Sequence, residues 1–498
     1  MTLSLKPHAL SLSRRQLLGQ AAAGLSLAGI SGLAGRQVFA DDSAVAALAQ
    51  AKDWGAGPSA LKGLPHFAPK AKRVILLWMG GGMSHVDLYD HKPGLEKLRF
   101  QDLPDSVRSG ARLSSMTAGY KSFPILPPIK PFKQYGQSGT RMSELLPHIG
   151  AMADDICLIN SMQTEAVNHS PGVTFSLSGS QVPGRPTLGA WLSYALGTQA
   201  TDLPGFVVMT STDEARTCGQ LFYEHYWSSG FIPSRFQGVR FRGGGDPVLY
   251  LGDPAGMDRA GKRDLLDDLG ELNRHRLTQV GDPEIDTRIA QYEMSYKMQS
   301  SVPDLLDIDK EPRHVRDLYG PDVMKRGSFA FNCLLARRLA ERGTRCIQLM
   351  HSGWDQHGNW SYHLEQMCKD TDQPAGGLLQ DLKQRGMLDD TLVICATEFG
   401  RTVFLQGNKD NPKAFGRDHF GRAYSTWMAG AGVKRGSVYG ETDEFAYNVV
   451  RDKMHVHDWQ ATVLHLLGID HTRLTYRYQG RQFRLSDVHG EVAKGVLA

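Results

Sequence analysis

Continuous apolar runs alternate with amphipathic stretches over most of the chain. Runs that are apolar at nearly every position are typical of strands buried on both faces of a sheet. Such strands are predicted at Arg73–Trp78, Asp155–Asn160, Phe206–Met209, Arg345–Met350, Thr391–Ala396 and Tyr424–Ala429. Helical spacing and capping residues predict helices at Ser143–Gly150, Pro171–Gly179, Gly327–Arg342, Pro374–Arg385 and Trp459–Leu467. Because strands and helices alternate, we expect an α/β fold whose mostly parallel sheet is covered by helices on both faces.

A charge-dense stretch at about residues 243–320 interrupts this alternation. Its apolar residues recur at helical spacing, as at Ile285, Ile289, Tyr292 and Tyr296. We therefore expect a helical insertion there, and a solvated surface subdomain is favoured over a binding element. Residues 41–72 are rich in alanine and then in proline and glycine, so they are predicted to form an arm ahead of one domain at 73–498.

The first 40 residues carry a targeting pattern. Two adjacent arginines at 14–15 precede a modestly apolar stretch that is rich in alanine and glycine, and Val38-Phe39-Ala40 is a small-residue cleavage site. A membrane anchor is the alternative, but glycines and serines interrupt the stretch, and no later run reaches the roughly 18 apolar residues that a membrane span needs. The pattern predicts bacterial twin-arginine export, a periplasmic or secreted location, and a mature chain with no transmembrane anchor.

Charge and cysteine content exclude several classes of protein. The chain holds 56 basic and 52 acidic residues, and four of the basic residues but none of the acidic ones lie in residues 1–40. The remainder is balanced, which argues against binding of nucleic acid or of an anionic membrane. None of the six cysteines forms a C-x-x-C pair, which argues against a zinc ribbon or a thioredoxin-like site. Cys346 and Cys395 lie in apolar strands and are predicted to be buried thiols.

Carboxylate and imidazole side chains gather near the ends of the predicted strands. Asp355 and His357 follow strand Arg345–Met350, Glu398 follows strand Thr391–Ala396, and Asp418 and His419 stand just before strand Tyr424–Ala429. Ligands of open α/β sheets bind outside the carboxyl ends of the strands, and these side chains are the usual ligands of divalent metals. The pattern predicts one or two metal ions (zinc, calcium, magnesium or manganese). The structural alternatives are a turn cap at Asp355, a surface position for His357, and an ion pair between Glu398 and Arg401.

Other candidate residues lie near the first strand and near residue 170. His85 and Asp87 follow the glycines at 80–82, which lack the spacing of a nucleotide-binding loop, so an NAD-type oxidoreductase has little support. No Gly-x-Ser-x-Gly elbow stands where an α/β-hydrolase needs it. His169 and Ser170 are the candidate nucleophiles, because they lie at a strand-to-helix junction where helix N–H groups favour an anionic ester. Asp458 is predicted to cap the last helix.

These motifs resemble those of the alkaline phosphatase superfamily, especially its sulfatase branch. His169-Ser170-Pro171 falls on the Cys-Ser-Pro of the sulfatase motif, and Thr397-Glu398-Phe399-Gly400 looks like its Ser/Thr-Asp-His/Asn-Gly. Asp418-His419 resembles a late histidine ligand of the phosphomutase branch. The whole chain looks like the exported family called domain of unknown function 1501, with Gly-Gly-Met-Ser-His85-Val-Asp87, Thr-Glu398-Phe-Gly-Arg401-Thr and Gly-Arg-Asp418-His419.

The resemblance implies an exported metal-dependent hydrolase that acts on phosphate or sulfate esters of small molecules or glycans. The alternative is a non-catalytic sulfatase-like envelope protein that binds a glycan or a protein partner. Two departures motivate that alternative: Met79 and glycines stand where sulfatases place aspartates, and Val173 stands at their arginine position. Because His169 occupies the nucleophile position, either Ser170 or a water activated by a metal would have to attack.

Overall fold

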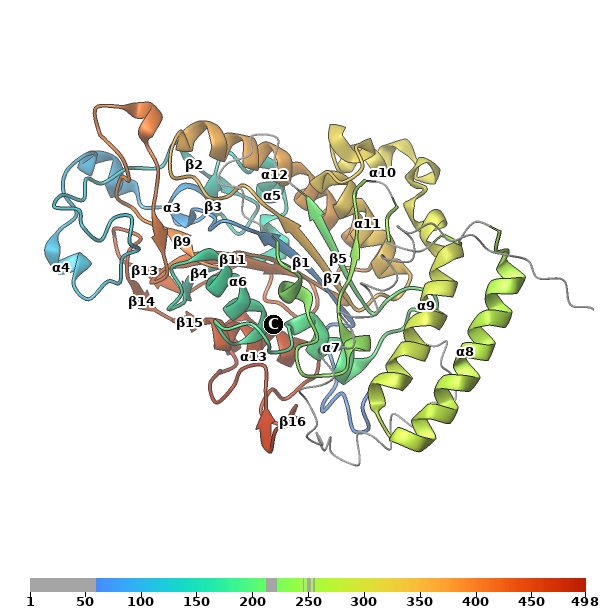
Figure 1. Cartoon of the computed structure of the whole chain (residues 1–498). Coiled ribbons are helices and arrows are strands. Elements are labelled where there is room, and N and C mark those ends of the chain that lie inside the picture. The colour runs from blue at the N-terminus through green and yellow to red at the C-terminus, as the bar shows by residue number, and fades with distance from the viewer. Residues whose placement is uncertain (1–59, 212–221, 245, 249–251, 254–255) are drawn as a thin grey trace, which may run out of the picture.

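The computed structural model describes residues 60–211, 222–244, 246–248, 252–253 and 256–498, and it has a mixed α/β architecture (Figure 1). Its central sheet has nine strands, in the order β12-β4-β11-β8-β1-β7-β5-β6, and β15 pairs with β4 beyond the end of β12. Only β11 runs antiparallel to its neighbours, so the expected mostly parallel sheet is confirmed. The strands are β1 (Arg73–Met79), β4 (Ile156–Gln163), β5 (Phe206–Ser211), β6 (Val239–Phe241), β7 (Cys346–His351), β8 (Thr391–Ala396), β11 (Tyr424–Ala429), β12 (Ser437–Tyr439) and β15 (Met454–His455).

The other described elements cover the sheet or extend from its rim. The helices are α3 (His85–Leu88), α4 (Asp105–Arg108), α5 (Pro147–Ala151), α6 (His169–Ser178), α7 (Leu188–Leu196), α8 (Arg259–Val280), α9 (Pro283–Leu306), α10 (Arg313–Leu318), α11 (Phe329–Glu341), α12 (Trp360–Gln384) and α13 (Val456–Leu466). Paired short strands are β2 (Phe132–Tyr135) with β3 (Thr140–Ser143), β9 (Gly400–Arg401) with β10 (His419–Phe420), β13 (Glu441–Thr442) with β14 (Val449–Arg451), and β16 (Tyr476–Tyr478) with β17 (Arg481–Phe483).

Strand β1 shows why continuous apolar runs build this sheet. Its side chains alternate between two cores, because successive residues of a strand point to opposite faces. Ile75 and Leu77 pack in one core with side chains of α5, α11 and α12, whereas Val74 and Leu76 pack in the other with side chains of α6, α7 and α13. Both faces of the sheet are therefore covered by helices, and Figure 1 shows these two groups of helices on opposite sides of the strands.

Most predicted elements are present, and the differences have local causes. Helix α12 begins at Trp360, well before the predicted start at Pro374, because Leu364, Met367 and Thr371 already bury one helical face ahead of the proline. Asp458 does not cap α13. The cap is His455, and Asp458 completes a capping box from the third helical position by accepting the N–H of His455 at 2.9 Å.

The charge-dense stretch contains two long helices. α8 packs along α9, and Figure 1 shows this pair at the edge of the molecule, with α8 outermost. The predicted signal segment 1–40 and the first part of the predicted arm lie outside the described residues. Of the helices that are described, none is both long enough and apolar enough to cross a membrane. Cys346 and Cys395 are buried free thiols, as predicted.

His351 at the end of β7 is a fully buried titratable group. Its Nδ1 lies 3.0 Å from the Ser211 hydroxyl, and its Nε2 lies 3.9 Å from a carboxylate oxygen of Asp370. Burial lowers the pKa of His351 to about 3, because the charged imidazolium loses its hydration in the core. The ring is therefore neutral in the folded protein.

Replacement of His351 by glutamine should make folding stability less sensitive to acid. The ring takes up a proton near pH 6.5 when the chain is unfolded and near pH 3 when it is folded, so its contribution to stability is complete above pH 6.5 and falls as the pH drops from 6.5 towards 3. The loss approaches about 1.4 kcal/mol per pH unit. Urea unfolding at pH 7 and pH 5 measures the difference between wild type and His351→Gln. His314→Gln, at an exposed position on α10, is the control. If the gap in unfolding free energy between wild type and His351→Gln is the same at pH 7 and pH 5, His351 does not contribute to acid sensitivity.

Candidate metal centre

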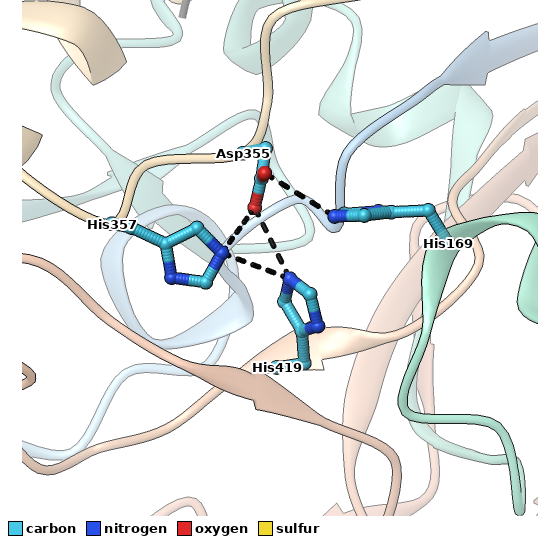
Figure 2. A group of neighbouring side chains, drawn as sticks. All are labelled: His169, Asp355, His357 and His419. Carbon is cyan, nitrogen blue, oxygen red and sulfur yellow. Dashed lines mark hydrogen bonds and ion pairs between the residues drawn. The ribbon is translucent and has the colours of Figure 1, made fainter. Parts of the chain in front are cut away.

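Four side chains that are distant in sequence converge at the rim of the sheet (Figure 2). Asp355 and His357 lie in the loop between β7 and α12, His419 begins β10, and His169 begins α6. One ligand atom from each of them lies within 4.8 Å of all the others. Asp355 and His419 are buried, while His169 and His357 stay 23% and 14% exposed, so the cluster faces solvent on one side.

The Asp355 carboxylate stands at the centre of the cluster. Its Oδ1 lies 2.7 Å from Nε2 of His357 and 3.2 Å from Nε2 of His419, and its Oδ2 lies 3.2 Å from Nε2 of His169. The Nε2 atoms of His357 and His419 are themselves only 3.0 Å apart. All three imidazoles therefore direct Nε2 at one carboxylate, as Figure 2 shows.

The Nδ1 contacts of His419 and His357 determine which ring nitrogen carries the proton. Nδ1 of His419 donates to the carbonyl oxygen of Val167 at 2.8 Å, and Nδ1 of His357 donates to the side-chain oxygen of Gln406 at 2.6 Å. In a neutral imidazole a proton on Nδ1 leaves a lone pair on Nε2. Both Nε2 lone pairs therefore point at the same region as the Asp355 oxygens, which is how metal-binding histidines are oriented.

His169 lies between two carboxylates. Its Nδ1 is 2.9 Å from Oε1 of Glu398, the same oxygen that accepts the backbone N–H of Gly81 at 2.9 Å. Burial lowers the pKa of His169, but the hydrogen bonds and charges of Asp355 and Glu398 outweigh burial and raise it to about 9. In the metal-free geometry the ring is thus an imidazolium that ties the Glu398 carboxylate to the cluster.

The pKa values of His419 and of the central carboxylate are lowered, unlike that of His169. Burial, assisted by the positive charges of Arg401 and His169, lowers the pKa of His419 to about 4, so this ring is neutral. Burial alone would raise the pKa of Asp355, but the Arg401 guanidinium and the contacts with the three histidines hold it well below its usual range. A neutral imidazole beside an ionised carboxylate is the protonation state that a metal requires of its ligands.

The buried Arg401 guanidinium contacts the central carboxylate and the loops around it. One of its terminal nitrogens lies 2.6 Å from Oδ1 of Asp355, and the same guanidinium donates to the carbonyls of Gly81, Gly82, Trp354 and Arg417. Close backbone approach makes this possible, because a Cβ atom at Gly81 (φ +125°) would lie 2.6 Å from the Asp355 nitrogen. Gly81 thus allows the backbone of the Asp355 loop to pack closely against it.

Four predicted metal ligands, His85, Asp87, Glu398 and Asp418, lie outside the cluster. Two of the carboxylates are occupied by other groups: Asp87 pairs with Arg417 at 2.7 Å, and Asp418 accepts the hydroxyls of Ser114 and Thr117. His85 contacts the carbonyl of Ala446 through Nε2 at 2.9 Å, and burial lowers its pKa. The side chains that the structure brings together are His169, Asp355, His357 and His419, and Glu398 contacts this group through His169.

The sequence analysis missed Gln406, Val167 and the true partner of Arg401. Gln406 and Val167 orient two imidazoles, but a single glutamine and a backbone carbonyl carry no recognisable spacing. Arg401 was considered as an ion-pair partner of Glu398, whereas it pairs with Asp355. Ser170, the other nucleophile candidate, is half-buried in the first turn of α6 beside His169.

Replacement of Asp87 by alanine should strongly destabilise the fold. The change leaves the Arg417 guanidinium, which is 1% exposed, without its carboxylate, and removes the acceptor of the Trp360 N–H. Loss of one partner of a buried pair costs about 3–5 kcal/mol. Asp105→Ala, which breaks a pair whose aspartate is 92% exposed, should cost less than about 1 kcal/mol. Chemical denaturation measures both variants, and equal small effects would show that the Asp87–Arg417 pair is not structural.

Comparison with known proteins identifies the family. Similar solved structures include the sulfatase PsFucS1 from Pseudoalteromonas sp. (13% identity, covering 92% of this chain and 75% of that one, TM-score 0.35). The C-terminal periplasmic domain of EcEptC from Escherichia coli, in complex with zinc, shows 10% identity, coverage of 84% and 85%, and a TM-score of 0.31. A protein in the alkaline phosphatase superfamily from Vibrio parahaemolyticus shows 11% identity, coverage of 88% and 76%, and a TM-score of 0.32.

Similarity at this level does not identify the reaction. The chain matches no curated protein. The family profile described as Protein of unknown function (DUF1501) matches residues 71–497, which is most of the chain. The protein therefore belongs to the DUF1501 family.

Proposed function

We propose that the protein is an exported, metal-dependent hydrolase of phosphate or sulfate esters, including esters carried on glycans. One observation carries the proposal: the lone pairs of His357 and His419 and the Asp355 carboxylate face one another at 2.7–3.2 Å. Lone pairs at such distances repel unless a cation lies among them. Arg401 contacts Oδ1 of Asp355, which His357 and His419 also face, and a divalent ion would supply positive charge among the imidazole nitrogens.

The donor set favours zinc, with manganese as the second choice. Three imidazole nitrogens and one carboxylate oxygen fit a four-coordinate zinc site, whereas magnesium and calcium prefer sites built from oxygen ligands. His169, Asp355, His357 and His419 would hold the ion. Gln406 and Val167 would act behind them, because their contacts to Nδ1 fix the orientation of two rings.

The start of α6 would bind the anionic ester group. His169 and Ser170 occupy the first turn of this helix, and Asn168 at the N-cap makes no side-chain bond to it. The N–H groups of a first helical turn and the helix dipole favour negative charge. An ester held there lies beside both the candidate metal ligands and the Ser170 hydroxyl.

Residue roles follow from this geometry. A bound divalent ion supplies Lewis acidity, which stabilises the negative charge that develops on the ester oxygens. Ser170 Oγ would form a bond to phosphorus or sulfur as the bond to the alcohol oxygen breaks, and the hydroxyl proton would pass to the departing alcohol. Water would later cleave the ester on Ser170, which restores the hydroxyl and releases phosphate or sulfate. Tyr226 lies beside Ser170 in the short turn Glu224–Trp227. Burial raises the pKa of its phenol to about 12, so the phenol keeps its proton there.

Metal content gives the first test. The folded protein, purified without a histidine tag and dialysed against trace zinc, should retain one ion per chain by mass spectrometry of the metal. His357→Ala and His419→Ala should each remove it, because each deletes one nitrogen ligand. Gln406→Ala should weaken zinc binding by about 10–100-fold, because the His357 ring loses its orienting partner.

His489→Ala is the matched control, since it removes an exposed histidine outside the cluster. It should leave metal content unchanged. Wild-type protein without stoichiometric metal under these conditions would contradict the proposed metal centre. Full metal content in both His357→Ala and His419→Ala would contradict it as well.

Activity gives the second test. The metal-loaded protein should hydrolyse 4-nitrophenyl phosphate or 4-nitrophenyl sulfate, and Asp355→Ala should abolish this activity together with the metal. Ser170→Ala should keep its metal but lose about a hundredfold or more in kcat, because the attacking hydroxyl is gone. Unchanged kcat in Ser170→Ala would instead assign the attack to water.

Inactivity of the metal-loaded protein toward both ester classes would contradict the hydrolase. In that case tight binding of an anionic polysaccharide, measured by calorimetry, would favour the non-catalytic envelope protein. The two outcomes are separable because metal content is measured on the same samples.

A further inference from the structure

Helix α8 carries an apolar stripe that the rest of the described chain leaves exposed. Leu265, Leu272 and Val280 are 43%, 64% and 63% exposed, and Leu269 between them is half-buried. Their spacing places all four on one side of a helix with 3.6 residues per turn. Single exposed apolar residues need no explanation, but a row of four on one helix marks an interaction surface.

Helix α9 covers a different side of α8. The buried residues of α8 are Leu266 and Gly270, and Arg263 is bound to Glu293 of α9 by two hydrogen bonds. The stripe runs beside that contact. In Figure 1 α8 lies at the outer edge of the molecule, beyond α9.

The charges along α8 are arranged in two blocks of opposite sign. Residues 264–271 hold Asp264, Asp267, Asp268 and Glu271 and no basic residue, whereas residues 273–280 hold Arg274 and Arg276 and no acidic one. Asp268 and Arg276 are exposed, and within the described part of the chain neither takes part in an ion pair. The blocks meet at Leu272.

We propose that α8 pairs with α8 of a second copy of the chain, antiparallel, about a two-fold axis at Leu272. In this arrangement Asp268 of each copy comes opposite Arg276 of the other, and the leucines of the two stripes meet beside them. Antiparallel packing of α8 and α9 from both copies gives a four-helix arrangement. No other partner is needed to satisfy the pattern, because the stripe is complementary to itself.

The interface is modest in size. A helix of 22 residues is about 33 Å long, so the contact lies near the lower end of the roughly 1,200–2,000 Å² that specific interfaces bury. A reversible dimer with a dissociation constant on the order of micromolar follows.

Light scattering coupled to gel filtration, from about 1 to 100 µM protein, tests the dimer across that range. Wild type should approach twice the mass of the chain at the upper concentrations, and Leu272→Asp should remain monomeric. Val182→Asp, a 70% exposed valine elsewhere on the surface, should behave as wild type.

Leu272→Cys should give a disulfide-linked dimer under oxidising conditions, because the residue lies on the axis, whereas Val182→Cys should not.

Charge exchange tests the orientation. Asp268→Arg and Arg276→Asp should each weaken the dimer by about tenfold or more at low salt, and the double variant should restore it, because the opposed charges are then exchanged in both copies. Circular dichroism should stay unchanged in all variants.

Wild-type protein that is monomeric at every concentration would overturn the proposal. A dimer that survives Leu272→Asp would place the interface elsewhere, and failure of the double variant to recover would exclude the antiparallel register.

Discussion

A single buried guanidinium holds the rim of this sheet together. Arg401 is 1% exposed and donates to backbone carbonyls at Gly81, Gly82, Trp354 and Arg417 as well as to the Asp355 carboxylate. These acceptors belong to loops that follow β1 and β7 and to the segment before β10. A buried cation is tolerated only when its donors are satisfied, so the position of each loop depends on the others. Asp355 owes its ionised state and its place in the cluster to this arrangement.

Two buried arginines at the rim have different consequences. Arg417 is fully matched, since Asp87 meets it with both oxygens and backbone carbonyls accept its remaining donors. Arg401 meets Oδ1 of Asp355, and the same oxygen faces the Nε2 atoms of His357 and His419, while Oδ2 faces His169. The first pair closes on itself and supports structure. The carboxylate of the second pair also stands among three imidazoles, which is why the same kinds of residue give a structural pair in one place and a candidate metal centre in the other.

The fold was largely predictable because continuous apolar runs have few alternatives to a strand buried on both faces, and β8 and β11 begin and end where their runs do. The position of Asp355 and His357 at this edge followed from the rule that carboxyl ends of parallel strands share one edge. His419 instead precedes β11, and it reaches the same edge because β11 runs antiparallel to its neighbours. Their separation from Asp87 and Asp418 did not follow, because it depends on Arg417, Ser114 and Thr117, whose proximity only the folded chain reveals. The start of α12 was misplaced because Pro374 was taken as a start signal although it lies inside the helix.

The candidate ligands also explain why a metal would affect more than the chemistry. They come from the start of α6, from the loop after β7 and from β10, so one ion would join three segments that otherwise meet only through hydrogen bonds. Without the ion, His169 is held as an imidazolium by Asp355 and Glu398, and this partly replaces the missing charge. Binding of the ion requires that ring to lose its proton and turn a lone pair inward. The same side chains would therefore serve both a protonated form and the proposed metal-bound form, which differ by the proton on His169.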